Sequence, residues 1–187
     1  QANLTITANS TSTQYGLGTT LGTTAFTSSG LQNNETIGNV LLASAGSANT
    51  TNVGTYNITA SGASNGTFNT ANYNISYVNG SLVVTQANLT LRANDQARTY
   101  GAANPGTGNV TITSGQLYNS DALSTATVTS AANATSNVGN YTLTASNQTL
   151  SSGLVGNYNI SYVDGNLQVT QANLTITANS TSTQYGL

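Results

Sequence analysis

The ionisable side chains of this chain are few and widely spaced. Its 187 residues include no Lys, His, Cys, Met or Trp. The formal charges are confined to Glu35, Arg92, Asp95, Arg98, Asp121 and Asp164. Without His or Cys there is neither an imidazole base nor a thiol nucleophile, and a hydroxyl with no base beside it is not activated. We therefore expect no catalytic residue and no enzyme activity.

The acidic residues are too far apart in sequence to suggest a shared site. Neither a general acid and base pair nor a calcium cage with several carboxylates is visible, so no metal and no cofactor is expected. Arg92 and Arg98 flank Asp95, which predicts a surface ion pair of small energetic value. Glu35 and Asp121 fall in corresponding loops of a repeat described below. Two arginines and a net charge of −2 do not form the basic surface that nucleic acid requires.

Asparagine followed two positions later by Thr or Ser occurs about sixteen times, and each instance is a formal N-glycosylation acceptor. Four of these fall on predicted outward strand faces and are the candidate modification sites: Asn57, Asn74, Asn140 and Asn159. The alternative is that they are a by-product of strands whose polar positions favour Asn and Thr. Both interpretations stay open at the level of sequence.

The elements that carry these side chains are predicted to be β-strands. Leu4 and Ile6 alternate with polar residues, and residues 55–60 and 140–145 repeat the alternation, which places apolar groups on one face of a strand. No segment sustains the 3.6-residue spacing of an amphipathic helix. No run of about twenty apolar residues occurs, so no membrane span is expected in this segment.

The sequence of residues 73–85 predicts a β-hairpin. Asn79-Gly80 is a favoured pair for a two-residue type I′ turn, which requires positive φ at both positions. Pairing outward from that turn places Tyr77 opposite Leu82, with both on the buried face. Asp164-Gly165 predicts the same hairpin in the second half of the chain.

The chain is built from repeats of 85 residues. Residues 1–17 return unchanged as residues 171–187, and a related copy begins at Gln86. The predicted organisation is a module over residues 1–85, a second over residues 86–170, and the first strand of a further repeat in residues 171–187. The chain is thus expected to be part of a longer tandem array.

Each module is predicted to be a small β-sandwich of the immunoglobulin-like kind with a tyrosine-rich core. The expected strands of the first module are residues 2–8, 23–28, 38–44, 53–60, 72–78 and 81–85. A β-grasp module is the alternative, and it would need a helix, for which residues 117–126 are the best candidate. No Pro or Gly linker separates the modules, which favours an elongated rod over a flexible string.

Four segments carry a resemblance to a known family. They are an opening LTITAN strand, a Tyr-Gly turn, a central VGTYNIT strand and a closing NYNISYVNGSLVV segment, at residues 4–9, 15–16, 53–59 and 72–84. The second module has them at residues 89–94, 100–101 (followed by Pro105), 138–144 and 157–169. The chain resembles the MBG-type repeat domains of large bacterial surface proteins, often found in filamentous-haemagglutinin-like adhesins. The first module departs from that pattern at residues 18–20, where a proline is expected.

The resemblance implies an extracellular location at a bacterial cell surface and no catalytic residues. Our leading hypothesis is a structural segment, the stalk of an adhesin or the body of a matrix filament, whose partners are neighbouring repeats of the same chain. The alternatives are an adhesive module that binds glycans or surface proteins directly, and lateral self-assembly with like chains into fibres. The last follows from the scarcity of the charged residues that normally keep strand edges apart.

Overall fold

The computed structural model describes residues 1–105 and 110–186 and is almost entirely β. Its only helical turns in that part of the chain are two three-residue 3₁₀ helices, η1 (Thr70–Asn72) and η2 (Val155–Asn157). The β-grasp alternative is therefore wrong. Residues 117–126, the candidate helix, instead form a turn followed by the short strand β11 (Ala122–Leu123). The absence of helical spacing in this segment is the physical reason.

The first module consists of two facing sheets. Its strands are β1 (Ala2–Ala8), β2 (Thr11–Gln14), β3 (Phe26–Ser29), β4 (Ile37–Ala43), β5 (Gly54–Gly66), β6 (Tyr73–Val78) and β7 (Gly80–Thr85). The orders are β3-β1-β6 and β2-β7-β5-β4. The sequence did not predict β2, because Thr11–Gln14 has no apolar residue. It exists because it pairs in parallel with β7, from Thr11↔Leu82 to Gln14↔Thr85.

The second module repeats this arrangement at an offset of 85 residues. Its further strands are β8 (Ala87–Ala93), β9 (Gln96–Thr99), β10 (Val110–Gly115), β12 (Thr127–Thr129), β13 (Gly139–Ser146), β14 (Leu150–Ser152), β15 (Tyr158–Val163) and β16 (Gly165–Thr170). The orders are β10-β8-β15, β12-β13-β16-β9 and β11-β14. The one long strand β5 corresponds to two pieces, β13 and β14, which are separated around Asn147 with a φ of 50°.

The predicted hairpin at Asn79-Gly80 is wrong. Strand β6 pairs in parallel with β1, whereas β7 pairs with β5 and β2, so the chain crosses from one sheet to the other at Asn79. Neither Asn79 nor Gly80 is among the described residues with positive φ. Glycine is needed here for close approach instead, because a Cβ on Gly80 would lie 2.6 Å from the carbonyl oxygen of Ala8. Gly165 repeats this arrangement, so the hairpin predicted at Asp164-Gly165 is wrong too.

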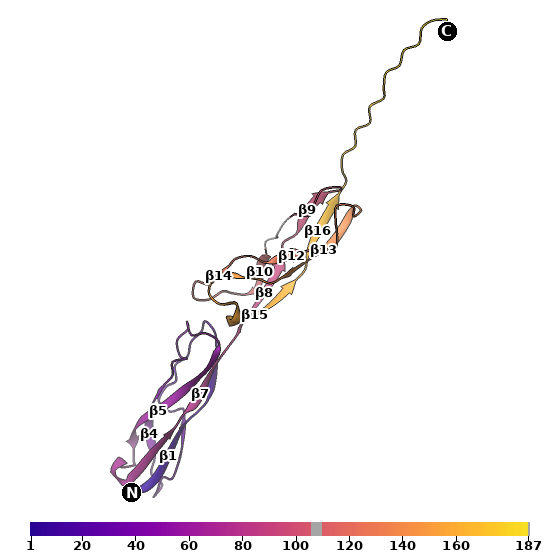
Figure 1. The fold of residues 1–187 in the computed structure, drawn as a ribbon. Helices are drawn as coiled ribbons and strands as arrows, with labels where there is room; N and C mark the ends of the chain where they lie inside the picture. Colours follow the sequence, from indigo (N-terminus) through magenta and orange to yellow (C-terminus); the bar gives the residue numbers. More distant parts are fainter. Residues whose placement is uncertain (106–109, 187) are drawn as a thin grey trace.

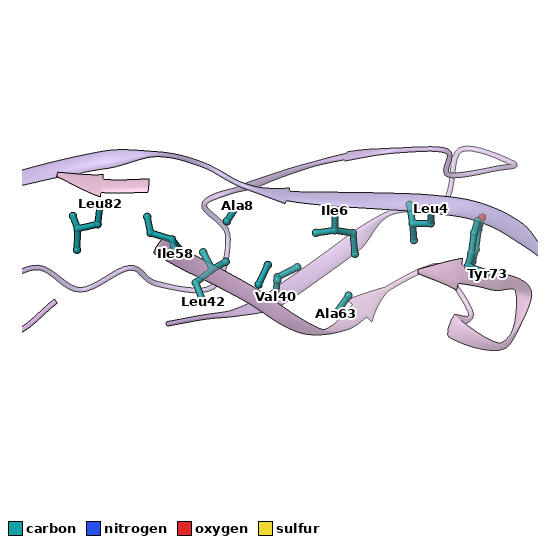
Figure 2. Packing of buried hydrophobic residues seen from close by; sticks show 10 residues of the cluster. Leu4, Ile6, Ala8, Val40, Leu42, Ile58, Ala63, Tyr73 and Leu82 are labelled. Carbon is teal, nitrogen blue, oxygen red and sulfur yellow. The ribbon is translucent and has the colours of Figure 1, made fainter. Parts of the chain in front are cut away.

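The core of the first module lies between its two sheets. Figure 2 shows side chains of β1 facing side chains of β4 and β5, namely Leu4, Ile6, Ala8, Val40, Leu42 and Ile58. Leu4, Ile6 and Val40 are 0% exposed. Burying an aliphatic side chain of this size contributes about 1.5–3 kcal/mol. The alternation in the sequence therefore identified the inward faces correctly.

Tyrosine hydroxyls tie loops to the start of strands β5 and β13. Tyr56 donates to the backbone oxygen of Asn52 at 2.9 Å, and Tyr141 donates to that of Asn137 at 2.9 Å. A tyrosine that bonds the backbone a few residues upstream is the tyrosine corner of immunoglobulin-like sandwiches.

Other tyrosines lie at the margin of the core. Tyr77 and Tyr162 accept backbone N–H bonds from Ala63 and Gln148, each at 2.9 Å. Tyr77 pairs with the buried Ile6 and lies on the inward face as predicted, but its side chain is 36% exposed. Its ring covers the edge of the sandwich while its oxygen satisfies a backbone donor.

The two modules follow one another along an elongated molecule with the termini at opposite ends (Figure 1). Residues 171–186 continue outward as an extended segment without strands. Leu174 and Ile176 in this segment are 83% and 85% exposed, although the identical positions Leu4 and Ile6 are fully buried. No helix of the described residues has the length and apolar character to cross a membrane.

Candidate functional site at the module junction

A single residue separates the last strand of the first module from the first strand of the second. Strand β7 ends at Thr85 and strand β8 begins at Ala87. The side chain of the intervening Gln86 donates from Nε2 to the carbonyl oxygens of Gly156 and Tyr158, at 3.0 and 3.2 Å. This connection is therefore held against the second module and does not act as a free linker.

A tyrosine of the first module is buried against the second. Tyr15 is 4% exposed and contacts Tyr118 and Tyr158 edge to face, with ring centroids 6.3 and 5.6 Å apart. It belongs to a cluster of buried residues from both modules that includes Val84 and Leu89. One buried apolar cluster thus spans the junction and lies between the cores of the two modules.

One carboxylate joins the tyrosines. Asp121 Oδ2 accepts the hydroxyl of Tyr15 at 3.0 Å and that of Tyr158 at 2.6 Å. Burial, and then the hydrogen bond to Asp121, raise the pKa of Tyr158 well above its usual range. The Tyr158 hydroxyl therefore stays protonated and donates a hydrogen bond to the Asp121 carboxylate.

A tight turn positions that carboxylate. The turn runs from Tyr118 to Asp121 and is closed by the Asp121 N–H, which donates to the Tyr118 carbonyl at 2.8 Å. Asn119 and Ser120 have φ values of 53° and 65°, a region that Asn tolerates better than most residues. The Tyr118 N–H in turn donates to the Tyr158 hydroxyl at 2.9 Å, which fixes the turn against the ring.

Gly16 makes room for the tyrosine cluster. Its φ is +90°, and a Cβ built on it would lie 2.1 Å from Cγ of Tyr118. No side chain fits there unless Tyr118 moves. In the Tyr15-Gly16 pair the tyrosine therefore supplies the ring and the hydroxyl, and the glycine supplies the space for the partner ring.

Asparagine side chains form the other part of the junction. Asn157 is 2% exposed. It accepts the Val53 N–H at 3.0 Å and donates to Asn52 Oδ1 at 2.9 Å. Asn119 Nδ2 donates to the Asn49 carbonyl at 2.9 Å. Contacts at several separated points resist both bending and rotation of one module against the other.

The structure places the four candidate glycosylation sites on exposed strand positions and does not bring them together. Asn57 lies on β5, Asn74 on β6, Asn140 on β13 and Asn159 on β15. Three of them bond a neighbouring asparagine, in the pairs Asn74–Asn3 (3.4 Å), Asn159–Asn88 (3.1 Å) and Asn140–Asn166 (3.3 Å).

The predicted surface ion pair is present between Arg92 and Asp95, with an Nη2–Oδ1 distance of 2.6 Å. The Asn166 N–H and then the Arg92 guanidinium hold the pKa of Asp95 below its usual range. Arg98 does not join this pair. It is 7% exposed and donates to Asn104 Oδ1 at 2.8 Å and to the Asn133 carbonyl. Within residues 1–105 and 110–186, no three acidic side chains meet to form a metal site.

The sequence did not identify Glu35 and Asp121 as acceptors for tyrosine hydroxyls. In the first module Tyr73 donates to Glu35, and this hydrogen bond raises the pKa of Tyr73. The available signal was their position in corresponding loops. What it lacked was the partner, because no spacing in the sequence relates these loops to strands β6 and β15.

Two small β modules joined end to end through buried side chains define a tandem-repeat protein of the all-β class. The family model of the MBG domain (YGX type) matches residues 4–83 and again residues 89–168, and the chain belongs to this family. Each matched segment contains a Tyr-Gly sequence, at residues 15–16 and 100–101. MBG repeat domains are non-catalytic structural modules that occur in surface proteins. A search of curated proteins finds no match to the chain.

Proposed function

We propose that this chain is a stiff segment of the stalk or fibre scaffold of an extracellular bacterial surface protein, an adhesin or a matrix filament. The observation that carries the proposal is the burial of Tyr15 against the second module, where its hydroxyl bonds Asp121. Modules on a flexible linker would keep such a ring exposed and would move independently. A buried junction instead holds successive modules in line, so that adding modules adds length.

The use of the tyrosines also favours a scaffold over an adhesive surface. Eight tyrosine hydroxyls of the described residues form hydrogen bonds within the chain, at Tyr15, Tyr56, Tyr73, Tyr77, Tyr118, Tyr141, Tyr158 and Tyr162. An adhesive surface requires several exposed rings close together with their polar groups available. Tyr100 and Tyr185, which are 46% and 104% exposed, lie apart from such a cluster.

Pulsed electron spin resonance on a doubly labelled chain tests the stiffness. The chain has no cysteine, so Thr55→Cys and Ser161→Cys introduce the only two labelling sites, one on each side of the junction. We expect one narrow distance distribution, and a broad one when Tyr15→Ala is added. A broad distribution in the parent chain would reject the scaffold proposal. A glycan array probed with the same chain tests the adhesive alternative, which specific binding to the modules would favour.

Lateral assembly is a second candidate because the edge strands of the first module are uncharged. Strands β2, β3, β4 and β6 lie at the sheet edges and contain no charged residue. Charged residues on edge strands normally prevent pairing between molecules. Electron microscopy at increasing concentration separates the outcomes, because isolated threads would argue against lateral assembly and bundles would favour it.

Glycosylation of Asn57, Asn74, Asn140 and Asn159 remains a proposal, supported by the exposure of all four side chains. Asn74, Asn140 and Asn159 each bond a neighbouring asparagine, so modification of Asn57 would disturb the fewest of these contacts. Peptide mass spectrometry of the protein isolated from its native source decides the matter. Unmodified mass at all four peptides would mean that the acceptor sequences are by-products of strand alternation.

A further inference from the structure

The outer end of the second module carries a copy of the surface that the first module presents at the junction. Tyr100, Asn137 and Val138 stand 85 residues after Tyr15, Asn52 and Val53. Tyr100 and Val138 are 46% and 53% exposed, whereas Tyr15 is 4% exposed. The Gly101 N–H donates to the Ala134 carbonyl at 3.2 Å, as the Gly16 N–H donates to the Asn49 carbonyl at 3.2 Å. The backbone of this end therefore has the conformation that the junction uses.

The outer end of the first module carries the complementary surface. Tyr73 donates to Glu35 and accepts the Gln32 N–H at 2.9 Å, as Tyr158 donates to Asp121 and accepts the Tyr118 N–H at 2.9 Å. The turn has the same form, because Asn33 and Asn34 have φ values of 52° and 55° where Asn119 and Ser120 have 53° and 65°.

Asn72 completes that surface. It occupies the position of Asn157, which is 2% exposed and binds Asn52 and Val53 across the junction. Asn72 itself is exposed, and so are its expected partners Asn137 and Val138. Asn72 therefore lies exposed at one end of the chain, and the groups that correspond to the partners of Asn157 lie exposed at the other.

We propose that the outer end of the second module is a docking surface for a further copy of the module formed by residues 1–85. In this second type of junction, Tyr100 donates to Glu35 of the copy, and Asn72 of the copy bonds Asn137 and the Val138 N–H. The inference rests on the proposed scaffold function and extends it: module contacts of two alternating kinds continue along the array.

Residues 171–186 supply the connection to that copy. They repeat residues 1–16, which form β1 and β2 of the first module. Thr170 ends β16 just as Thr85 ends β7, and Gln171 then stands where Gln86 does. Leu174 and Ile176 are exposed because the strands that bury Leu4 and Ile6 in the first module have no counterpart around them in the described chain.

The second junction differs from the first in its aromatic contacts. Gln32 replaces Tyr118, so Gly101 of the second junction faces an amide side chain where Gly16 faces a ring. No atom of residues 1–105 or 110–186 lies within 4 Å of a Cβ built on Gly101. The Tyr100 to Tyr73 ring contact is retained, and the contact equivalent to Tyr15–Tyr118 is lost. The second junction is therefore the less aromatic of the two.

The test uses the whole chain with the sequence of residues 18–85 added after Leu187, which completes the copy. Asn140→Cys, together with Ser76→Cys made in the added copy, places spin labels across the second junction. These positions correspond to Thr55→Cys and Ser161→Cys across the first. We expect a single narrow distance distribution. Tyr100→Ala, and independently Glu35→Gln made in the added copy, should each cause loss of the narrow peak.

The matched control is Tyr185→Ala. It removes the tyrosine equivalent to Tyr100 from the free end of the added copy and should leave the distance distribution unchanged. Circular dichroism and tyrosine fluorescence establish that each variant is folded. A narrow first junction with a broad second one would overturn this inference and leave the scaffold proposal intact. Broad distributions at both would overturn both. A narrow second junction that is insensitive to Tyr100→Ala would also overturn the inference, because the alignment would then have another cause.

Discussion

The two Tyr-Gly turns of this chain have the same backbone form and opposite surroundings. At residues 15–16 the tyrosine is 4% exposed, and the space beside the glycine is filled by Tyr118. At residues 100–101 the tyrosine is 46% exposed, and no atom of the part of the chain that the structure describes fills the space beside the glycine. The φ values of Gly16 and Gly101 are nearly equal, at +90° and +87°. The turn is therefore a property of each module, whereas its burial is a property of the pair.

This comparison separates two roles that a glycine can combine. A positive φ requires glycine at both turns, because other residues pay about 1–2 kcal/mol there. Only Gly16 must also be small, since its missing side chain admits a ring from the next module. Matched substitutions at the two turns can therefore separate the free-energy cost of backbone strain within a module from the cost of losing the contact between modules.

The largest expected difference is between Gly16→Ala and Gly101→Ala. Both introduce the backbone strain of about 1–2 kcal/mol. Gly16→Ala adds overpacking against Tyr118, which typically costs a further amount of about 1–3 kcal/mol. Urea unfolding followed by tyrosine fluorescence measures the difference, and the absence of tryptophan leaves that signal unobscured. Equal destabilisation by the two substitutions would contradict the packing of Tyr118 on Gly16.

The next effect is that of the tyrosine hydroxyl. Tyr15→Phe removes one donor to Asp121, and a hydrogen bond to a charged group contributes about 1.5–3 kcal/mol. Tyr100→Phe is the control at the other turn, and exposed substitutions usually stay within about 0.5 kcal/mol. The same urea titration gives both values. Equal and small effects would mean that the Tyr15 hydroxyl contributes nothing to the junction.

Alkaline pH should weaken the second module through Tyr158. An unfolded tyrosine ionises near about pH 10. Because the folded pKa is higher, unfolding releases a proton above that pH. The contribution of Tyr158 to stability should therefore be constant below about pH 10 and fall as the pH rises further. Thermal unfolding across this range should show a shallower fall in Tyr158→Phe, and an unchanged slope would contradict the raised pKa.

The smallest effect concerns a surface ion pair outside both turns, Arg92–Asp95. The pKa of Asp95 is lowered in the folded chain, so its contribution is present above the unfolded pKa of about 3.9 and disappears as the pH falls through the folded value. Asp95→Asn should slightly destabilise the chain at neutral pH and have no effect in strong acid. Unfolding at the two pH values tests this, with Asp164→Asn as a control on an exposed acid outside the ion pair. An equal loss at both values would point to packing, not charge.

The sequence predicted the strands that have an alternating apolar face and missed those that depend on partners. Leu4 and Ile6 alternate with Thr, so β1 was predicted with its bounds, and Leu4 and Ile6 are fully buried. The four residues of β2 have no such pattern and are extended only because β7 lies beside them. Local sequence does not contain that neighbour.

The hairpin error has a specific cause. Asn-Gly is favoured in a type I′ turn, but glycine is also favoured wherever two backbones approach closely. A hairpin within one sheet and a crossing between two facing sheets both place Tyr73 and Leu82 toward the core. In each case the inward positions are odd-numbered before Asn79 and even-numbered after it. The pattern of apolar residues therefore could not distinguish a hairpin within one sheet from a crossing between two sheets. The pairing of β6 with β1 decides the matter.

The junction was the least predictable feature. Its acceptor, Asp121, lies more than a hundred residues from Tyr15, and neither residue is unusual in its local sequence. The repeat suggested that modules adjoin, and the absence of a linker suggested stiffness. The contacts themselves depend on the direction in which strands β7 and β8 lead the chain, which sequence patterns do not specify.

The parallel pairing of β2 with β7 has a mechanical consequence. Tension along the molecule enters a module near its first strands and leaves through β7, and β2 and β7 are hydrogen-bonded side by side from Thr11↔Leu82 to Gln14↔Thr85. A pull from opposite ends slides two such strands past each other, so the bonds of the ladder are loaded in shear and all at once. The same pairing joins β9 to β16 in the second module. A pull along the long axis of the molecule should therefore meet more resistance than one that opens these bonds one at a time.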